Sequence, residues 1–98
     1  MKILVMYRPK SSIKPEDFMP LQGKQAGEVF KLMGEGAIRE AYSFDGHTGG
    51  AYIMEADSVD AARETLQRLP FIERDMFDVS FEGLMPYRGF FAVAQAMG

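Results

Sequence analysis

Residues 38–56 read IREAYSFDGHTGGAYIMEA, and this stretch decides the fold. The first seven residues alternate as a strand does, with Ile38, Glu40, Tyr42 and Phe44 on one side and Arg39, Ala41 and Ser43 on the other. Residues 45–50 form a glycine-rich turn, and residues 51–56 are rich in strand-forming side chains. The pattern predicts a β-hairpin.

Helical spacing precedes this hairpin. Over residues 15–33 the expected apolar stripe is Phe18, Leu21, Ala26, Val29, Phe30 and Met33. Pro15 suits a first helical position. Pro20 removes a backbone donor inside a helix, so the helix is either kinked there or begins near it.

A second helix is expected after the hairpin. Asp57 or Ser58 can cap its start, and Pro70 ends it. The spacing of Val59, Ala62, Leu66 and Leu69 gives it one apolar side.

The outer segments predict two more strands. Residues 3–8 are apolar on both faces, which is typical of a central strand. Residues 76–85 alternate strictly, with Phe77, Val79 and Phe81 on one side and Asp78, Ser80 and Glu82 on the other. The order β-α-β-β-α-β predicts an α+β, ferredoxin-like fold with an antiparallel sheet.

Both helices of such a fold cover the same sheet face. The other face keeps apolar residues of the central strand, such as Leu4 or Ile3, and a bare apolar face favours a partner. We therefore expect a homodimer or higher oligomer that closes a dimeric α-β barrel. The tail from Tyr87, with Phe90, Phe91 and Val93, is too apolar for water, so it should pack on its own domain or on a partner.

Length and composition narrow the class of protein. Ninety-eight residues suit one domain, residues 1–98. A net charge of −3 with scattered basic residues argues against a nucleic-acid partner. No apolar run is long enough for a membrane span, and the absence of cysteine suits the cytoplasm.

Metal and cofactor sites are not expected. The chain has no cysteine and one histidine, and none of its acid clusters has calcium-loop spacing. The glycine-rich turn lacks the Lys-Ser/Thr pair of a phosphate loop.

Several short motifs resemble the muconolactone isomerase family of dimeric α-β barrels. They are Gly46-His47, Asp57-Ser58-Val59, Thr-Leu-Gln-Arg-Leu-Pro at 65–70, and Glu82-Gly83-Leu84. The resemblance covers roughly the C-terminal half and implies the same fold and a cofactor-free isomerase. Arg39 and Tyr42 match an arginine and an aromatic of the family's second strand, while Ser43 replaces its second arginine and Gly50 its asparagine.

Three groups of residues are candidates for chemistry. His47 is the only side chain that titrates near neutrality, and on the turn it could move a proton at the mouth of a cleft. The alternative is an exposed turn residue. Asp78 and Glu82, with Ser80 between them, could act as acid, base and ligand contact in the dimer space, or could form the wet side of an edge strand.

Arg39, Tyr42 and Tyr52 could orient an anionic or phenolic ligand, since arginine binds carboxylates in a bidentate manner. The alternatives are a surface ion pair for the arginine and core packing for Tyr42.

Three functions remain open from the sequence. The first is binding of a small apolar or aromatic molecule, with cofactor-free isomerisation by proton transfer. The second is cofactor-independent oxygenation of an aromatic compound. The third is a non-catalytic binding or assembly module.

Overall fold

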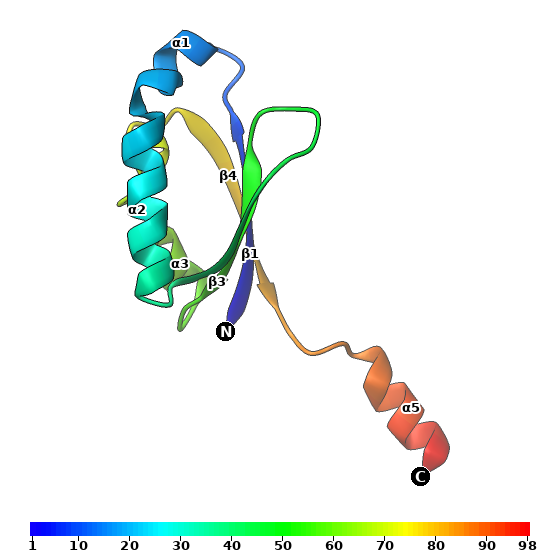
Figure 1. Ribbon diagram of the computed structural model, residues 1–98. Helices are drawn as coiled ribbons and strands as arrows, with labels where there is room; N and C mark the ends of the chain where they lie inside the picture. Colours follow the sequence, from blue (N-terminus) through cyan, green and yellow to red (C-terminus); the bar gives the residue numbers. More distant parts are fainter.

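The computed structural model describes residues 1–98 as a four-stranded antiparallel sheet with helices on one side (Figure 1). The strands are β1 (Lys2–Pro9), β2 (Ile38–Ser43), β3 (Gly50–Glu55) and β4 (Phe77–Leu84). The helices are α1 (Pro15–Phe18), the 3₁₀ turn η1 (Met19–Leu21), α2 (Gln22–Gly34), α3 (Val59–Leu66), α4 (Pro70–Glu73) and α5 (Gly89–Met97). The strand order β2-β3-β1-β4 confirms the ferredoxin-like α+β fold, with β1 in the centre. None of these helices combines the length and the apolar character that a membrane crossing needs.

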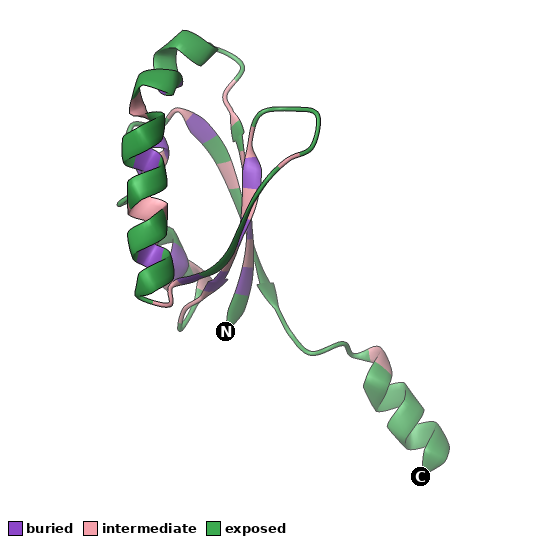
Figure 2. Ribbon diagram, viewed as in Figure 1, coloured by how far each residue is buried: buried purple, intermediate pink, exposed green.

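The core lies between the sheet and the helices. Its buried members are Ile3, Val5, Leu32, Ile38, Tyr52, Met54, Ala62, Leu66 and Leu69. Figure 2 shows that the buried residues lie where the sheet faces the helices. Ser58 caps α3, because its hydroxyl accepts a hydrogen bond of 3.0 Å from the amide of Ala61.

The first helical region is broken at Pro20, and this break moves its buried side. Gln25 and Leu32 are buried, whereas Phe30 is 78% exposed. The expectation that Ala26, Phe30 and Met33 face the core was wrong. Residues of a 3₁₀ turn advance about 120° each instead of about 100°, so η1 rotates the following helix by roughly 60°.

Strand β2 also departs from the expected alternation. Ile38 pairs with Met54 and Glu40 with the next residue, Ile53, so Arg39 is the extra residue of a β-bulge. Ile38 therefore faces the core, whereas Glu40 and Tyr42 face the other side of the sheet. The expectation that Ile38 shares a side with them was wrong for this reason.

The sheet face without helices, here called the open face, follows from the strand register. Leu4 pairs with Ile53 and Glu82, and Met6 with Ala51 and Ser80. Paired residues of an antiparallel sheet point to the same side, so the open face has an apolar centre. Along β4 it carries Asp78, Ser80 and Glu82. Ile3, by contrast, is completely buried under the helices.

The C-terminal residues leave the body of the molecule. Figure 1 shows α5 beyond the end of the sheet, and none of its residues is buried. Packing of this tail on its own domain, one of the two expected outcomes, is contradicted.

Candidate functional site

Two adjoining cavities lie between α2 and the sheet, and together we call them the tyrosine cleft. Their volumes are about 250 and 220 Å³, which together suit a small ligand. Both are lined by Tyr7, Gln22, Ser43 and Phe71. Among the residues that line only one of them are Gln25, Tyr42 and Tyr52 in the first, and Phe18, His47 and Phe77 in the second.

A stacked tyrosine pair forms one wall of the cleft. The rings of Tyr7 and Tyr52 lie 4.9 Å apart between centroids at an angle of 21°. Tyr52 is only 3% exposed. Its burial, with a further contribution from Tyr7, raises the pKa of the Tyr52 hydroxyl far above its ordinary value. Tyr52 is therefore a neutral hydroxyl over the whole physiological range of pH.

Gln25 connects this pair to α4. Its amide nitrogen donates to the Tyr52 hydroxyl at 3.4 Å. Its amide oxygen accepts from the backbone nitrogen of Phe71 at 3.0 Å. Phe71 lies in the first turn of α4, where the backbone donors have no partner within the helix. One buried side chain thus positions the cleft tyrosine and satisfies a helix terminus.

The glycines at the end of the hairpin turn allow the backbone to approach Tyr7. Gly49 has a φ of 119°, a conformation that other residues rarely adopt. A Cβ atom on Gly50 would lie 2.0 Å from the carbonyl oxygen of Tyr42 and 2.6 Å from the hydroxyl of Tyr7. The glycine-rich turn is therefore required by packing around the cleft.

His47 lies on this turn, exposed, and lines the smaller cavity. Its ring stacks on Phe44 with centroids 4.9 Å apart. The guanidinium of Arg8 lies 5.2 Å from the same phenylalanine ring. A ligand in the cleft would thus meet an imidazole at the outer end and a tyrosine hydroxyl at the inner end.

The remaining candidates lie in different places. Tyr42 borders the cleft through its strand, but its side chain lies on the open face, where its hydroxyl donates to the carboxylate of Glu40 and its pKa is raised as a result. Arg39 donates from Nε to the carbonyl oxygen of Gly36 at 2.7 Å, in a separate polar cleft that excludes Tyr42. Asp78, Ser80 and Glu82 are exposed on the open face. The structure gathers the side chains of His47 and Tyr52 around one cleft and leaves those of the other five candidates outside it.

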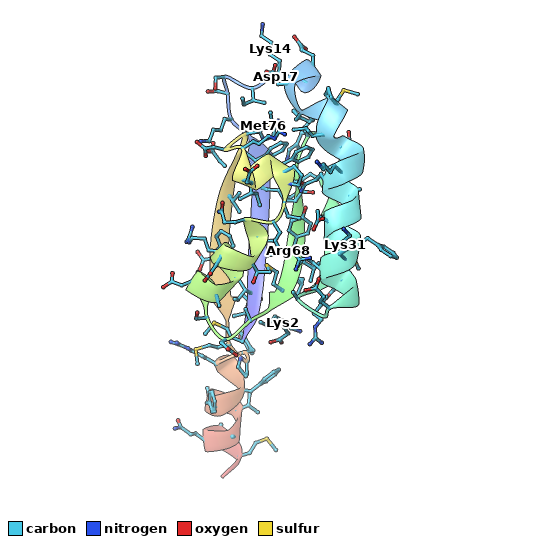
Figure 3. The ribbon with its side chains drawn as sticks, turned by 90° about the vertical axis from the view of Figure 1, so that its left-hand side faces the viewer. Lys2, Lys14, Asp17, Lys31, Arg68 and Met76 are labelled. Carbon is cyan, nitrogen blue, oxygen red and sulfur yellow. The ribbon has the colours of Figure 1, made fainter.

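In the polar cleft around Arg39, the second guanidinium, that of Arg68, is already paired. Arg68 donates to both carboxylate oxygens of Glu35, at 2.8 Å each, and lies between α3 and α2 in Figure 3. Hydrogen bonding to Arg68 holds the pKa of Glu35 below its ordinary value. Nowhere in the molecule do three or more histidine, cysteine or acidic side chains gather as a metal site would need.

The lining residues that sequence reasoning missed include Tyr7, Gln22, Gln25 and Phe71. Gln25 was detectable in principle, because it lies one helical turn from both Leu21 and Val29. A polar residue among apolar ones on a core-facing stripe needs an internal partner. This signal can be recognised only if the side of the helix that faces the core is known, and the break at Pro20 made that side hard to predict.

Comparisons with known proteins place this geometry in context. The model of the YCII-related domain matches residues 9–80. The structure is similar to muconolactone isomerase, with a TM-score of 0.72, 22% identity, and coverage of 90% of this chain and 92% of that one.

It is also similar to 5-chloro-2-hydroxyhydroquinone dehydrochlorinase from Burkholderia phenoliruptrix AC1100, in complex with 2,5-dihydroxybenzoquinone. That match has a TM-score of 0.71 and 18% identity, and covers 87% of this chain and 94% of that one. No curated protein sequence matches. At these identities the similarity shows a shared fold, and it confirms the muconolactone isomerase-like architecture.

Proposed function

This chain belongs to the YCII-related domain family, and we propose that it is a cofactor-free enzyme that moves a proton on a small oxygenated ring. The tyrosine cleft is the proposed site. The observation that carries the proposal is the stacked Tyr7–Tyr52 pair, held by the buried Gln25. The pair offers an aromatic surface and a neutral hydrogen-bond donor in the same place.

The proposed step is proton transfer next to a carbonyl group. The Tyr52 hydroxyl donates a hydrogen bond to the carbonyl oxygen, and this bond strengthens as the oxygen becomes an enolate. The imidazole of His47 takes the proton when the neighbouring C–H bond breaks, and returns it to another carbon. Atoms and charge balance without an oxidant or cofactor, so the product is an isomer of the substrate.

The two structural neighbours support this substrate class. One is an isomerase of a lactone, and the other was captured with a dihydroxybenzoquinone. Both names describe oxygenated rings of a size that suits a cleft of this volume.

We also propose that the chain is a homodimer through the open face. Leu4, Met6 and Ile53 form its apolar centre, and contiguous apolar surface of this kind is typical of an interface. Asp78, Ser80 and Glu82 then lie at the interface rather than in the substrate site.

Ligand titration tests the cleft, with 2,5-dihydroxybenzoquinone as the probe and calorimetry as the readout. Tyr52→Phe should weaken binding about tenfold, the value of one hydrogen bond of about 1.4 kcal/mol. Tyr87→Phe is the matched control, because Tyr87 is exposed and outside the cleft. If Asp78→Asn weakens binding and Tyr52→Phe does not, the site is on the open face and the assignment is wrong.

Isomerisation of muconolactone tests the chemistry. His47→Ala should lower kcat about 10²- to 10⁴-fold while binding of the probe changes little. Unchanged turnover in this variant would remove His47 from the mechanism.

A second candidate function is supported by the cleft's phenylalanine wall. Phe18, Phe71 and Phe77 have ring centroids 4.7–5.6 Å apart, and such a wall suits an electron-rich aromatic that reacts directly with oxygen. Oxygen uptake with a quinol, in the absence of lactone isomerisation, would favour it.

A further inference from the structure

The C-terminal arm, residues 85–98, is the most apolar exposed part of the molecule. Helix α5 reads GFFAVAQAM and has no charged residue. Phe90 is 68% exposed, Phe91 65% and Met97 83%. A cluster of this kind is costly in water, because each aromatic side chain offers about 150–250 Å² for burial.

The arm also needs a partner in order to persist as a helix. Isolated helices shorter than about 12–15 residues are marginal in water, and α5 has 9 residues. The edge-to-face contact of Tyr87 with Phe90, 5.1 Å between centroids, lies within the arm. Its own body contributes no burial, so the stabilising contact must come from outside this copy.

The direction of the arm indicates where that contact lies. Figure 1 shows α5 leaving on the side of the sheet opposite α2, which is the side of the open face. Exposed apolar side chains continue from Leu84, at the end of β4, through Met85 to Tyr87. The apolar surfaces of the open face and the arm are therefore continuous.

We propose that α5 packs against a second copy of this chain, so that two copies exchange their C-terminal arms about a two-fold axis. This inference rests on the proposed homodimer and adds to it the segment that holds the copies together. In a two-fold interface each surface meets its complement twice, so one association covers both arms and both open faces. A foreign partner on α5 would leave the open face bare.

Area supports the same occupant. A stable interface buries about 800 Å² per partner. The apolar centre of the open face consists of half-buried side chains and is small. Three arm aromatics, Tyr87, Phe90 and Phe91, exposed by about two thirds, add roughly 300–500 Å². The arm therefore supplies a large share of the interface area that the open face alone does not provide.

Charge is complementary as well. Arg88 is the only charged side chain of the arm, and its one side-chain hydrogen bond is to the sulfur of Met85. Asp78 and Glu82 on the open face form no ion pair within their own chain. An exchanged arm can bring a free cation to free carboxylates at the rim of the interface, where charges select the partner.

Sedimentation equilibrium of the full chain tests the proposal. The double variant Phe90→Glu/Phe91→Glu should raise the dimer dissociation constant about 100-fold or more, as expected for central aromatic contacts. The control is Phe30→Glu, at a residue 78% exposed on the helix side, which should change it less than about threefold. Equal effects of the two variants, or a dimer that the double variant leaves intact, would overturn the proposal.

A mixed-label dimer tests the exchange directly. One chain is labelled with ¹³C, and filtered NMR detects contacts between the Phe90 or Phe91 rings of one copy and the Leu4 or Ile53 methyl groups of the other. Contacts confined to one chain would contradict exchange. The exchange would also be contradicted if the chain were monomeric and bound phosphatidylcholine vesicles through its arm in a flotation assay.

The double variant should still bind 2,5-dihydroxybenzoquinone, because the cleft lies on the helix side. A monomeric wild type that binds this probe would defeat the arm exchange and leave the cleft assignment standing. A dimer with exchanged arms that does not bind the probe would support the arm exchange and contradict the cleft assignment.

Discussion

Replacement of Gln25 by leucine should lower the free energy of unfolding, although the two side chains are similar in size. The change leaves the backbone N–H of Phe71 buried without an acceptor, and removes the longer hydrogen bond to the Tyr52 hydroxyl. An unsatisfied buried donor costs about 1–3 kcal/mol, and a 3.4 Å contact adds little. Since leucine regains part of this cost by apolar burial, we expect a net loss of about 2 kcal/mol.

Urea denaturation followed by circular dichroism measures this loss. With an m value of about 1 kcal/mol/M the midpoint falls by about 2 M. Protein concentration is held fixed, because dimerisation contributes to apparent stability. The control is Gln22→Leu, the same change three residues earlier on the same helix, at an exposed side chain with no hydrogen bond. It should change the free energy of unfolding by less than about 0.5 kcal/mol.

Hydrogen exchange of the Phe71 amide gives a local readout. The amide should be protected in the wild type and in Gln22→Leu, and should lose protection in Gln25→Leu. Equal stability of the two variants, with the Phe71 amide protected in both, would refute the role of Gln25.

The other predictions concern single contacts. Gly50→Ala should cost at least about 2 kcal/mol in urea unfolding, because its Cβ would overlap a backbone carbonyl, whereas Gly23→Ala, in open space on α2, should stabilise by about 0.5–1 kcal/mol. Ser58→Ala removes the cap of α3 and should lower the free energy of unfolding by about 1 kcal/mol. The pKa of Glu35 is lowered in the folded state, so its pairing stabilises the protein above the ordinary carboxyl pKa and is lost as pH falls through the lowered value. The stability difference between wild type and Glu35→Gln should therefore disappear in acid unfolding curves, and a difference that grows toward low pH would contradict this.

Local signals were sufficient for the order of the elements. The apolar run in residues 3–8, alternation in residues 38–44 and 76–85, helical spacing before and after the hairpin, and the glycine-rich turn are all properties of neighbouring residues. Together they predicted the ferredoxin-like order that the sheet confirms. The side that Phe77 and Asp78 each take on β4 was predictable as well, because an uninterrupted strand has a period of two.

Beyond an irregularity in a helix or strand, the side that a residue faces was not predictable in the same way. The 3₁₀ turn after Phe18 rotated α2 and exposed Phe30, and the bulge at Arg39 separated Ile38 from Tyr42. Each irregularity inserts a local change of geometry that composition does not encode. Side chains beyond it then change orientation, including that of Gln25, which is buried.

The sequence by itself determined the order of the four strands and of the two helical regions that cover the sheet, and it named His47 and Tyr52 among its candidates, because these depend on residue types and short spacings. It did not indicate that Pro70 begins the short helix α4 or that the tail forms α5. Only the tertiary structure decided that Tyr7, Gln25 and Tyr52 share one cleft, that Arg39 lies outside it, and that the apolar tail leaves its own domain. Those facts depend on strand register, helix rotation and the direction of the chain after β4, and each is fixed by contacts between residues far apart in the sequence.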